Sequence, residues 1–332
     1  VALPFWGKYH GMSRAWAADS EVRFRAATGG VLTAMGVWLV RSGRAAFILH
    51  CRADAAAPMQ TRWTMSNTPE EVVAAAGSRY GPSDTLAGLE QALARGTPFA
   101  IIAKPCDANA VLARVKADPR IDALIVAVLV MVCGGASDLG KSRALLDEIG
   151  LEEENVRLFR YRGHGNPGPT RVESESGAAW EKSYLEMWED EAGWRIQTRC
   201  KLCPDAIGEA ADLAASDVWP GGAPSGEDAG FNGVITRTQR GEALYQAALA
   251  DGALSADIGF SPRDFDEFQP HQVRKKRAIA ARLRGLASVG HPVFSHAHLR
   301  ISDLDASRAE DEEGAATRVR SGRFSETLSK ET

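Results

Sequence analysis

The sequence lacks the features that mark membrane, secreted and nucleic-acid-binding proteins. Its longest apolar run, Ala123 to Cys133, is far shorter than the roughly 20 residues of a membrane-spanning helix and is typical of a buried strand. A net charge of −4 leaves no excess of Lys and Arg for binding nucleic acid. No cationic segment followed by an apolar stretch opens the sequence, so we expect no secretory signal and a cytoplasmic location.

Cysteine is scarce, with five residues in a chain of 332. Because the cytosol keeps thiols reduced, we do not expect these cysteines to form disulfides. The remaining composition, 45% hydrophobic and 25% charged, is that of a globular protein with ample material for a core. The grouping of the cysteines is therefore more informative than their number.

Strands and helices alternate through the first half of the chain. A helix is predicted over 31–40, between Thr28 and Gly43, and a strand follows from Ala45 to Cys51. The next predicted elements are helices over 69–76, 86–95 and 107–116 and strands over 99–103 and 124–132. This alternation predicts an α/β fold, in which a mixed or parallel sheet is flanked by helices.

The pattern changes after Gly150 and indicates a second, β-rich portion, which we expect to carry the cysteine site. Its predicted elements are strands over 156–162, 170–174, 194–198 and 234–237, and helices over 242–250 and 272–286. The sequence from Ser302 onward is charged and rich in small residues. We therefore divide the chain into portions 1–98 and 99–300 and a mobile charged tail, 301–332.

The sharpest signal is Cys200-Lys201-Leu202-Cys203-Pro204. Two thiolates at this spacing can bind one metal centre, and a following proline helps to direct backbone N–H groups toward the sulfur atoms. Cys106 and Cys133 each follow a predicted strand, the position at which ligands gather in an open α/β sheet. These four cysteines suit an iron–sulfur cluster, a zinc ion or, more simply, buried thiols, and the wide separation of the two single cysteines favours the cluster. Cys51 has no motif around it and is expected in the core.

Several motifs recur here in the order found in a known family. They are Thr28-Gly29-Gly30 before a buried helix, Gly77-Ser78-Arg79-Tyr80-Gly81-Pro82, Pro105-Cys106, Cys133-Gly134-Gly135 and Cys200-x-x-Cys203-Pro204-Asp205. From about residue 20 to about residue 240 the chain resembles the beta subunit family of coenzyme F420 hydrogenases and dehydrogenases. This family includes the 7-hydroxymethyl chlorophyll a reductases and the ferredoxin-type divinyl chlorophyllide reductases.

The resemblance implies an oxidoreductase with FAD, bound largely by portion 1–98, and one [4Fe–4S] cluster held by Cys106, Cys133, Cys200 and Cys203. Electrons would pass between a reduced carrier, F420 or ferredoxin, and a second substrate. Two features depart from the family pattern. The chain has no additional ferredoxin-like cysteine segment, so a second cluster is not expected, and Ala103-Lys104 stands where relatives often have Gly-Thr.

Two glycine-containing segments are candidates for binding the FAD. Thr28, Gly29 and Gly30, with Thr33 in the first helical turn, would present helix N–H groups to a polar or anionic group, although a plain helix cap is the alternative. The segment Gly77, Ser78, Arg79 and Tyr80 offers hydroxyls, a cation and an aromatic ring for a pyrophosphate and a ring system. Its alternative is a helix-ending glycine followed by surface residues.

Lys104, Arg162 and His164 are the candidate catalytic residues. Lys104, with Asp107, would place a charge beside the flavin, or the two would only pair with each other. Arg162 and His164 belong to a glycine-rich stretch that could bind an acidic substrate and donate a proton, or form a solvated turn. The stretch contains GxGxxG, but Pro167 disfavours the helix that a dinucleotide motif requires.

Three functions stay open from the sequence. The chain is an enzyme, a non-catalytic electron-transfer subunit of a larger complex, or a zinc-stabilised binding module. The cationic stretch Arg274-Lys275-Lys276-Arg277 is either a solvated helix face or a docking site for an acidic ferredoxin. His291, His296 and His298 have metal-like spacing but are more typical of ordinary surface or core histidines.

Overall fold

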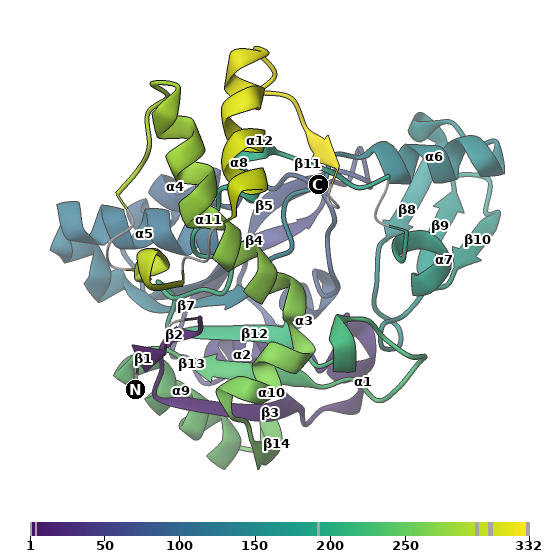
Figure 1. Ribbon diagram of the computed structural model, residues 1–332. Helices are drawn as coiled ribbons and strands as arrows, with labels where there is room; N and C mark the ends of the chain where they lie inside the picture. The colour runs from purple at the N-terminus through teal and green to yellow at the C-terminus, as the bar shows by residue number, and fades with distance from the viewer. Residues whose placement is uncertain (1, 4, 191–192, 296–298, 305–307, 330–332) are drawn as a thin grey trace.

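The main element of the fold is an eight-stranded sheet in the order β14-β3-β13-β12-β7-β6-β4-β5 (Figure 1). The computed structural model describes every residue except 1, 4, 191–192, 296–298, 305–307 and 330–332. The strands of this sheet are β3 (Gly11–Ala17), β4 (Phe47–Ala53), β5 (Thr61–Ser66), β6 (Phe99–Ala103), β7 (Ile125–Met131), β12 (Leu213–Asp217), β13 (Asn232–Thr236) and β14 (Leu254–Gly259).

The four central strands β12, β7, β6 and β4 run parallel to one another. Strand β3 is antiparallel to β13, which is antiparallel to β12, so β3 has the same direction as the parallel group. The carboxyl ends of all five strands therefore lie at one edge of the sheet. The predicted mixed sheet with flanking helices is confirmed.

Helices cover both faces of the sheet. On one face α2 (Val31–Arg41) and α9 (Gln239–Ala250) pack on the strands, and on the other face α4 (Leu89–Ala94) and α5 (Pro105–Ala117) do so. The adjacent residues Ile48 and Leu49 of β4 are both 0% exposed and belong to opposite faces. This two-sided burial explains why these strands are continuously apolar rather than alternating.

A small antiparallel sheet, β10-β9-β8, stands to one side of the main sheet (Figure 1). It consists of β8 (Val156–Arg160), β9 (Thr170–Ser174) and β10 (Ala179–Lys182), with α6 (Gly140–Ile149) and α7 (Tyr184–Trp188) beside it. The predicted β-rich portion exists, but none of its three strands contains a cysteine. Cys200 and Cys203 follow the small sheet in the chain and belong to α8 (Thr198–Lys201) and the loop after it.

The remaining elements are short or lie after the main sheet. They are β1 (Ala2–Leu3), β2 (Gly7–Lys8), α1 (Ser20–Arg25), α3 (Pro69–Ala74), β11 (Arg195–Ile196), α10 (Pro262–Phe268), α11 (Pro270–Ser288), α12 (Ala309–Arg320) and β15 (Leu328–Ser329). In the part of the chain that the structure describes, no helix combines the length and apolar character needed to cross a membrane.

The segment predicted as a charged tail contains a packed helix. Helix α12 lies along α11 (Figure 1), where Arg282 pairs with Asp311 at 2.8 Å and Arg284 with Glu312 at 3.0 Å. Further along, β15 pairs with β11. The charges that suggested a solvated tail are therefore, in part, ion-pair partners of α11.

Several predicted features differ from the structure. The strand predicted over 194–198 is only Arg195–Ile196, because α8 begins at Thr198. The boundary proposed at residue 98 falls inside the main sheet, since β4 and β6 on either side of it pair directly. Strand β3, for which no element is predicted, pairs with β13 and β14, which lie far away in the sequence.

Gly285 permits the close approach of α12 to α11, and its replacement tests that packing. A Cβ at Gly285 would lie 2.0 Å from the Glu312 carbonyl oxygen, whereas one at Gly314 meets nothing within 4 Å. We expect Gly285→Ala to lower the free energy of unfolding by about 1–3 kcal/mol through overpacking. Gly314→Ala should raise it by up to about 1 kcal/mol through helix propensity. Urea unfolding measures both values, and equal effects would contradict the close packing of these helices.

Candidate functional site

The four cysteines predicted to bind a metal centre lie around the carboxyl edge of the main sheet. Cys106 is in the first turn of α5, directly after β6, and Cys133 follows the end of β7. The backbone N–H of Cys133 donates to the Ala206 carbonyl at 2.8 Å, and that of Ala136 donates to the Cys200 sulfur at 3.3 Å. These bonds join the loop after β7 to the segment that carries Cys200 and Cys203.

Neighbouring thiols are close enough to affect one another's deprotonation. Cys133 raises the pKa of Cys106 and Cys203, and Cys200 raises the pKa of Cys133. Among the residues that the structure describes, however, no three His, Cys, Asp or Glu side chains are grouped tightly enough to hold a metal ion. The four cysteines therefore lie in one region of the described structure, but their side chains do not form a closed set of metal ligands.

Burial is the largest influence on the pKa of three of these thiols, Cys106, Cys133 and Cys203. It raises the pKa of Cys133 and Cys106, and it raises the pKa of Cys203 to about 12. Buried thiols without a nearby metal stay protonated, and a bound metal or cluster would reverse this preference by supplying positive charge. A set of four soft sulfur donors fits zinc or an iron–sulfur centre rather than a hard cation.

A buried carboxylate, Asp205, organises the loop after Cys203. It is 1% exposed and accepts hydrogen bonds from the Asn109 side chain at 2.8 Å and from the Glu209 backbone N–H at 2.8 Å. Asn109 lies one turn after Cys106 on α5. Asp205 thus connects the helix of Cys106 to the loop of Cys203, a role that the sequence motif did not reveal.

Helix α11 closes the site from another side. The Gln272 side chain donates to the Cys133 carbonyl at 3.0 Å. Lys276 is 6% exposed, and its ammonium group donates to the Phe5 carbonyl at 2.6 Å and pairs with Glu209. The cysteine loops are therefore held between the sheet, α5 and α11.

Lys104 and Asp107, predicted to flank the flavin, pair with each other at 2.8 Å. Lys104 also donates to the Ser83 carbonyl at 3.1 Å. The two side chains of the pair are largely buried. The pairing that the sequence left as an alternative is thus present, at the same strand end as Cys106.

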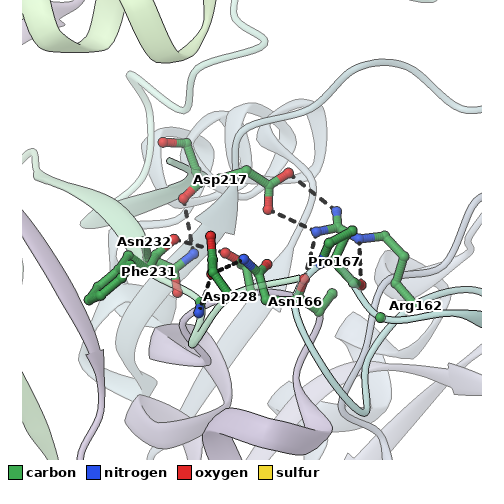
Figure 2. Close-up of polar contacts among 12 residues, drawn as sticks. Arg162, Asn166, Pro167, Asp217, Asp228, Phe231 and Asn232 are labelled. Carbon is green, nitrogen blue, oxygen red and sulfur yellow. Dashed lines mark hydrogen bonds and ion pairs between the residues drawn. The ribbon is translucent and has the colours of Figure 1, made fainter. Parts of the chain in front are cut away.

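Arg162 is the centre of a buried polar network, which Figure 2 shows. Its guanidinium faces the Asp217 carboxylate at 3.2 Å and donates to the Ala27 carbonyl at 2.6 Å. Burial is the largest single influence and opposes its charge, but Asp217, Tyr80 and Tyr184 together outweigh burial, so the pKa of Arg162 is raised. The guanidinium also lies 4.6 Å from the Trp219 ring centre. The side chain predicted to bind a substrate is therefore engaged inside the protein.

The side chain of His164 is exposed, although Arg162 and Asn166 on either side of it in the chain are buried. Its backbone has a φ of 60°, and its ring contacts Phe24 of α1 at 5.4 Å. Nearby, Asn166 donates from its side chain to Asp228 (Figure 2). No contact of His164 with the four cysteines is found among the described residues.

The Thr28-Gly29-Gly30 segment packs on the start of β13. Thr28 donates to the Phe231 carbonyl at 2.8 Å, and Asn232 caps α2 by accepting from the Val31 N–H at 3.1 Å. A Cβ on Gly29 would lie 2.7 Å from the Asn232 backbone nitrogen, so close packing alone requires glycine here. Thr33, in the first turn of α2, is half-buried.

The segment from Gly77 to Tyr80 is also strongly engaged. Arg79 donates to the side chain of Thr61 at 3.2 Å and to the carbonyls of Pro58, Gln60 and Phe159 at 2.7, 2.6 and 3.1 Å. Binding a pyrophosphate would require it to leave these acceptors. The Tyr80 ring lies 4.7 Å from Trp188 and 5.3 Å from Trp194, while Gly77, with a φ of 101°, and Ser78 are half-buried.

Cavities of about 290 and 210 Å³ lie elsewhere in the molecule. The larger is bounded by β3, α9 and β14, and the smaller by α6, β9 and β10. Neither is lined by the residues predicted to hold FAD. Of the three histidines with metal-like spacing, His291 contacts the Phe324 ring, tilted by 41° with ring centres 4.2 Å apart, and His296 and His298 lie outside the described residues.

Comparison with known proteins matches two family models to the chain. The model described as coenzyme F420 hydrogenase/dehydrogenase, beta subunit N-term, matches residues 12–90. The model for the C terminus of the same beta subunit matches residues 96–258. The second match contains all four cysteines of the candidate site, and the two together span most of the main sheet.

Individual relatives agree with these models. The coenzyme F420 hydrogenase subunit beta of Methanococcus voltae is 23% identical over 310 residues, 88% of this chain and 99% of the relative. An uncharacterized protein of Methanocaldococcus jannaschii is 24% identical over 60% of this chain and 54% of its own length. A chain of the F420-reducing [NiFe] hydrogenase complex of Methanosarcina barkeri has the same fold, with a TM-score of 0.59, 20% identity and coverage of 83% of this chain and 95% of that one.

The Arg162–Asp217 pair makes a testable contribution to stability. Asp217→Ala would leave a buried guanidinium without its carboxylate, so we expect the free energy of unfolding to fall by about 3–5 kcal/mol. The control is Asp257→Ala, which removes the partner of Arg14 at the surface, where side chains are 27% and 37% exposed, and should cost less than about 1 kcal/mol. Denaturant unfolding of both variants provides the values. A similarly small loss for Asp217→Ala would show that Arg162 does not depend on this carboxylate.

Proposed function

Because this chain belongs to the coenzyme F420 hydrogenase/dehydrogenase beta subunit family, we propose that it is an iron–sulfur flavoprotein oxidoreductase. It passes electrons between a reduced carrier and a second substrate by means of FAD and one [4Fe–4S] cluster. The observation that carries the proposal is the gathering of Cys106, Cys133, Cys200 and Cys203 around one edge of the sheet.

The proposed cluster ligands are these four cysteines. Asp205 and Gln272 support this assignment, because Asp205 accepts from Asn109 on the helix of Cys106 at 2.8 Å and Gln272 donates to the Cys133 carbonyl at 3.0 Å. Thiolate ligands need such fixed surroundings, since the hydrogen bonds around the sulfurs and their burial set the properties of a cluster. A one-electron cluster beside a flavin, which accepts one or two electrons, supplies the chemistry of converting between two-electron and one-electron transfer.

The proposed flavin site is the neighbouring part of the same edge. Two buried polar atoms there, Nε1 of Trp219 and Oδ1 of Asn166, have no hydrogen-bond partner among the described residues. An unpaired donor and an unpaired acceptor in the interior are costly unless a bound polar group satisfies them. Both residues adjoin the Arg162 network. This observation supports a polar, planar ligand beside the cysteines.

The residues predicted to bind FAD take proposed roles that follow from their contacts. The start of α2 would be provided by Thr28, Gly29, Gly30 and Thr33. A second loop would be provided by Gly77, Ser78 and Tyr80, whose ring contacts Trp188. Lys104, paired with Asp107, provides a cation at the end of β6. We propose that Arg162 and Arg79 stabilise these loops, since both guanidiniums donate hydrogen bonds to carbonyl groups inside the protein.

His164 keeps its proposed role as a proton donor only for a substrate that reaches its exposed side chain.

The electron carrier is proposed to be a ferredoxin or F420. Cys106 is the exposed member of the four cysteines, and exposed Arg199 is close enough to affect its charge. Arg274 adds an exposed cation on α11. Positive charge around the accessible side of the cluster would attract an acidic carrier and speed its association.

A second candidate is a subunit that relays electrons without catalysing the reaction. The structurally similar chain from Methanosarcina barkeri is part of a hydrogenase complex, which favours this possibility. Turnover by the purified chain with reduced carrier and substrate, in the absence of a partner, separates the two candidates. A zinc-stabilised binding module is the third, and it would give a colourless protein, whereas bound flavin and iron absorb visible light.

Cysteine substitution tests the proposed cluster. We expect anaerobically purified protein to contain about four irons per chain, in keeping with a single cubane cluster. Cys133→Ser, Cys106→Ser and the double variant Cys200→Ser/Cys203→Ser should lose most of this iron, because each removes a thiolate ligand. Iron, acid-labile sulfide and flavin are measured in each sample.

The matched control is Cys51→Ser, because Cys51 lies in β4 outside the proposed ligand set. It should keep the iron and the flavin of the unchanged protein. Retention of iron in the double variant would refute the cluster assignment. Zinc in place of iron, together with a colourless protein, would support the binding module.

A further inference from the structure

The small antiparallel sheet brings two arginines together on one face. Arg160 of β8 lies directly opposite Arg171 of β9, and Arg171 in turn lies opposite Glu181 of β10. Like charges that lie directly opposite each other on neighbouring strands repel and destabilise the pair. The two arginines therefore need negative charge close to them.

The glutamates on this face provide less negative charge than its arginines require. Glu173 accepts hydrogen bonds from Arg157 and, at 2.6 Å, from Arg171. One oxygen of Glu181 accepts from Arg171 at 2.8 Å, and the same oxygen lies 3.8 Å from Arg160. Three arginines thus share these two carboxylates, and Arg160 has the longest of the contacts.

The guanidinium of Arg160 is largely buried but incompletely paired. Its side chain is 17% exposed, and its Nε has no hydrogen-bond partner among the described residues. The 3.8 Å ion pair with Glu181 is longer than a hydrogen bond. Burial lowers the pKa of Arg160, and of the two nearest charges Glu181 raises it while Arg171 lowers it. A cation in this position is stabilised by an additional anion, because removal from water is costly without full compensation.

The loop that follows β8 does not supply the missing negative charge. Partial burial lowers the pKa of His164, and three nearby arginines lower it further, namely Arg160, Arg25 and Arg171. Glu21 acts on His164 in the opposite direction, but it is already paired with Arg25 at 2.6 Å. The surroundings of Arg160 therefore have an excess of positive charge.

We propose that Arg160 and Arg171 form an oxyanion-binding site for the phosphate or carboxylate group of a small molecule. A guanidinium presents paired N–H donors that match two oxygens of such a group. An anion held between the two side chains would offset their repulsion and give Arg160 the acceptors that it lacks. Neither arginine belongs to the proposed cysteine ligands or to the residues proposed to bind FAD, so the site does not depend on those cofactors.

Binding of inorganic phosphate and of succinate to the full chain tests this site. Calorimetric titration is carried out at low ionic strength, because salt screens the attraction between exposed charges. Arg160→Gln removes the charge, and Arg160→Lys retains the charge without the paired donors. Arg157→Gln is the matched control, since it removes another arginine of the same face whose partner is Glu173. Flavin content and the thermal unfolding midpoint are measured for each variant.

We expect the unchanged protein to bind one oxyanion per chain. Arg160→Gln should weaken binding by about tenfold or more, because hydrogen bonds to charged groups are lost. Arg160→Lys should weaken it less, and Arg157→Gln should leave it within about threefold, since Arg157 contributes only distant, screened charge. The anion should raise the unfolding midpoint of the unchanged protein but not that of Arg160→Gln. Tighter binding of phosphate or of succinate identifies which of the two groups the site prefers.

Three outcomes would overturn the inference. The first is the absence of saturable binding of either anion to the unchanged protein. The second is equal weakening by Arg160→Gln and Arg157→Gln, which would indicate a general attraction to a charged surface. The third is loss of flavin from Arg160→Gln, because the anion would then belong to the cofactor site. If Arg160→Gln does not fold, Arg160→Lys provides the same comparison with Arg157→Gln. A protein without iron or flavin that still binds phosphate through Arg160 would refute the proposed function but not this site.

Discussion

The parallel pairing of β4, β6, β7 and β12 is the constraint on which the candidate site depends. Parallel strands place their carboxyl ends at one edge, so loops that are distant in sequence must begin there together. Cys106 and Cys133 are neighbours for this reason, although helix α5 and strand β7 lie between them in the sequence. The helices that bury both faces of the sheet fix this edge in turn.

Buried charges hold the loops at this edge. Asp205, Arg162 and Lys276 are 1%, 3% and 6% exposed, and each has several internal partners. A buried charge without partners is costly, so moving the partner of any of these groups away would cost free energy. The same elements that stabilise the loops therefore also define where the cysteines lie.

Local signals are predictable from the sequence, whereas long-range contacts are not. The predicted strand 99–103 coincides with β6, because a continuous apolar run is sufficient evidence for it. Strand ends and the spacing of Cys200 and Cys203 likewise indicate which cysteines lie near the sheet edge, while their binding of a metal centre stays a prediction. Strand β3 escapes prediction, since its sequence, GMSRAWA, is largely polar or small and its partners lie far along the chain. The pairing of Asp217 with Arg162 escapes it for the same reason, because it depends on the folded arrangement.

The pairing of β11 with β15 has a consequence for the order of events during synthesis. Thr198, two residues before Cys200, donates to the Glu326 carbonyl at 2.9 Å, and Arg195 of β11 donates to Thr327 at 3.1 Å. A nascent chain at the ribosome contains all four cysteines well before it contains these C-terminal partners. The helix of Cys200 thus gains its final support only when translation has passed residue 327.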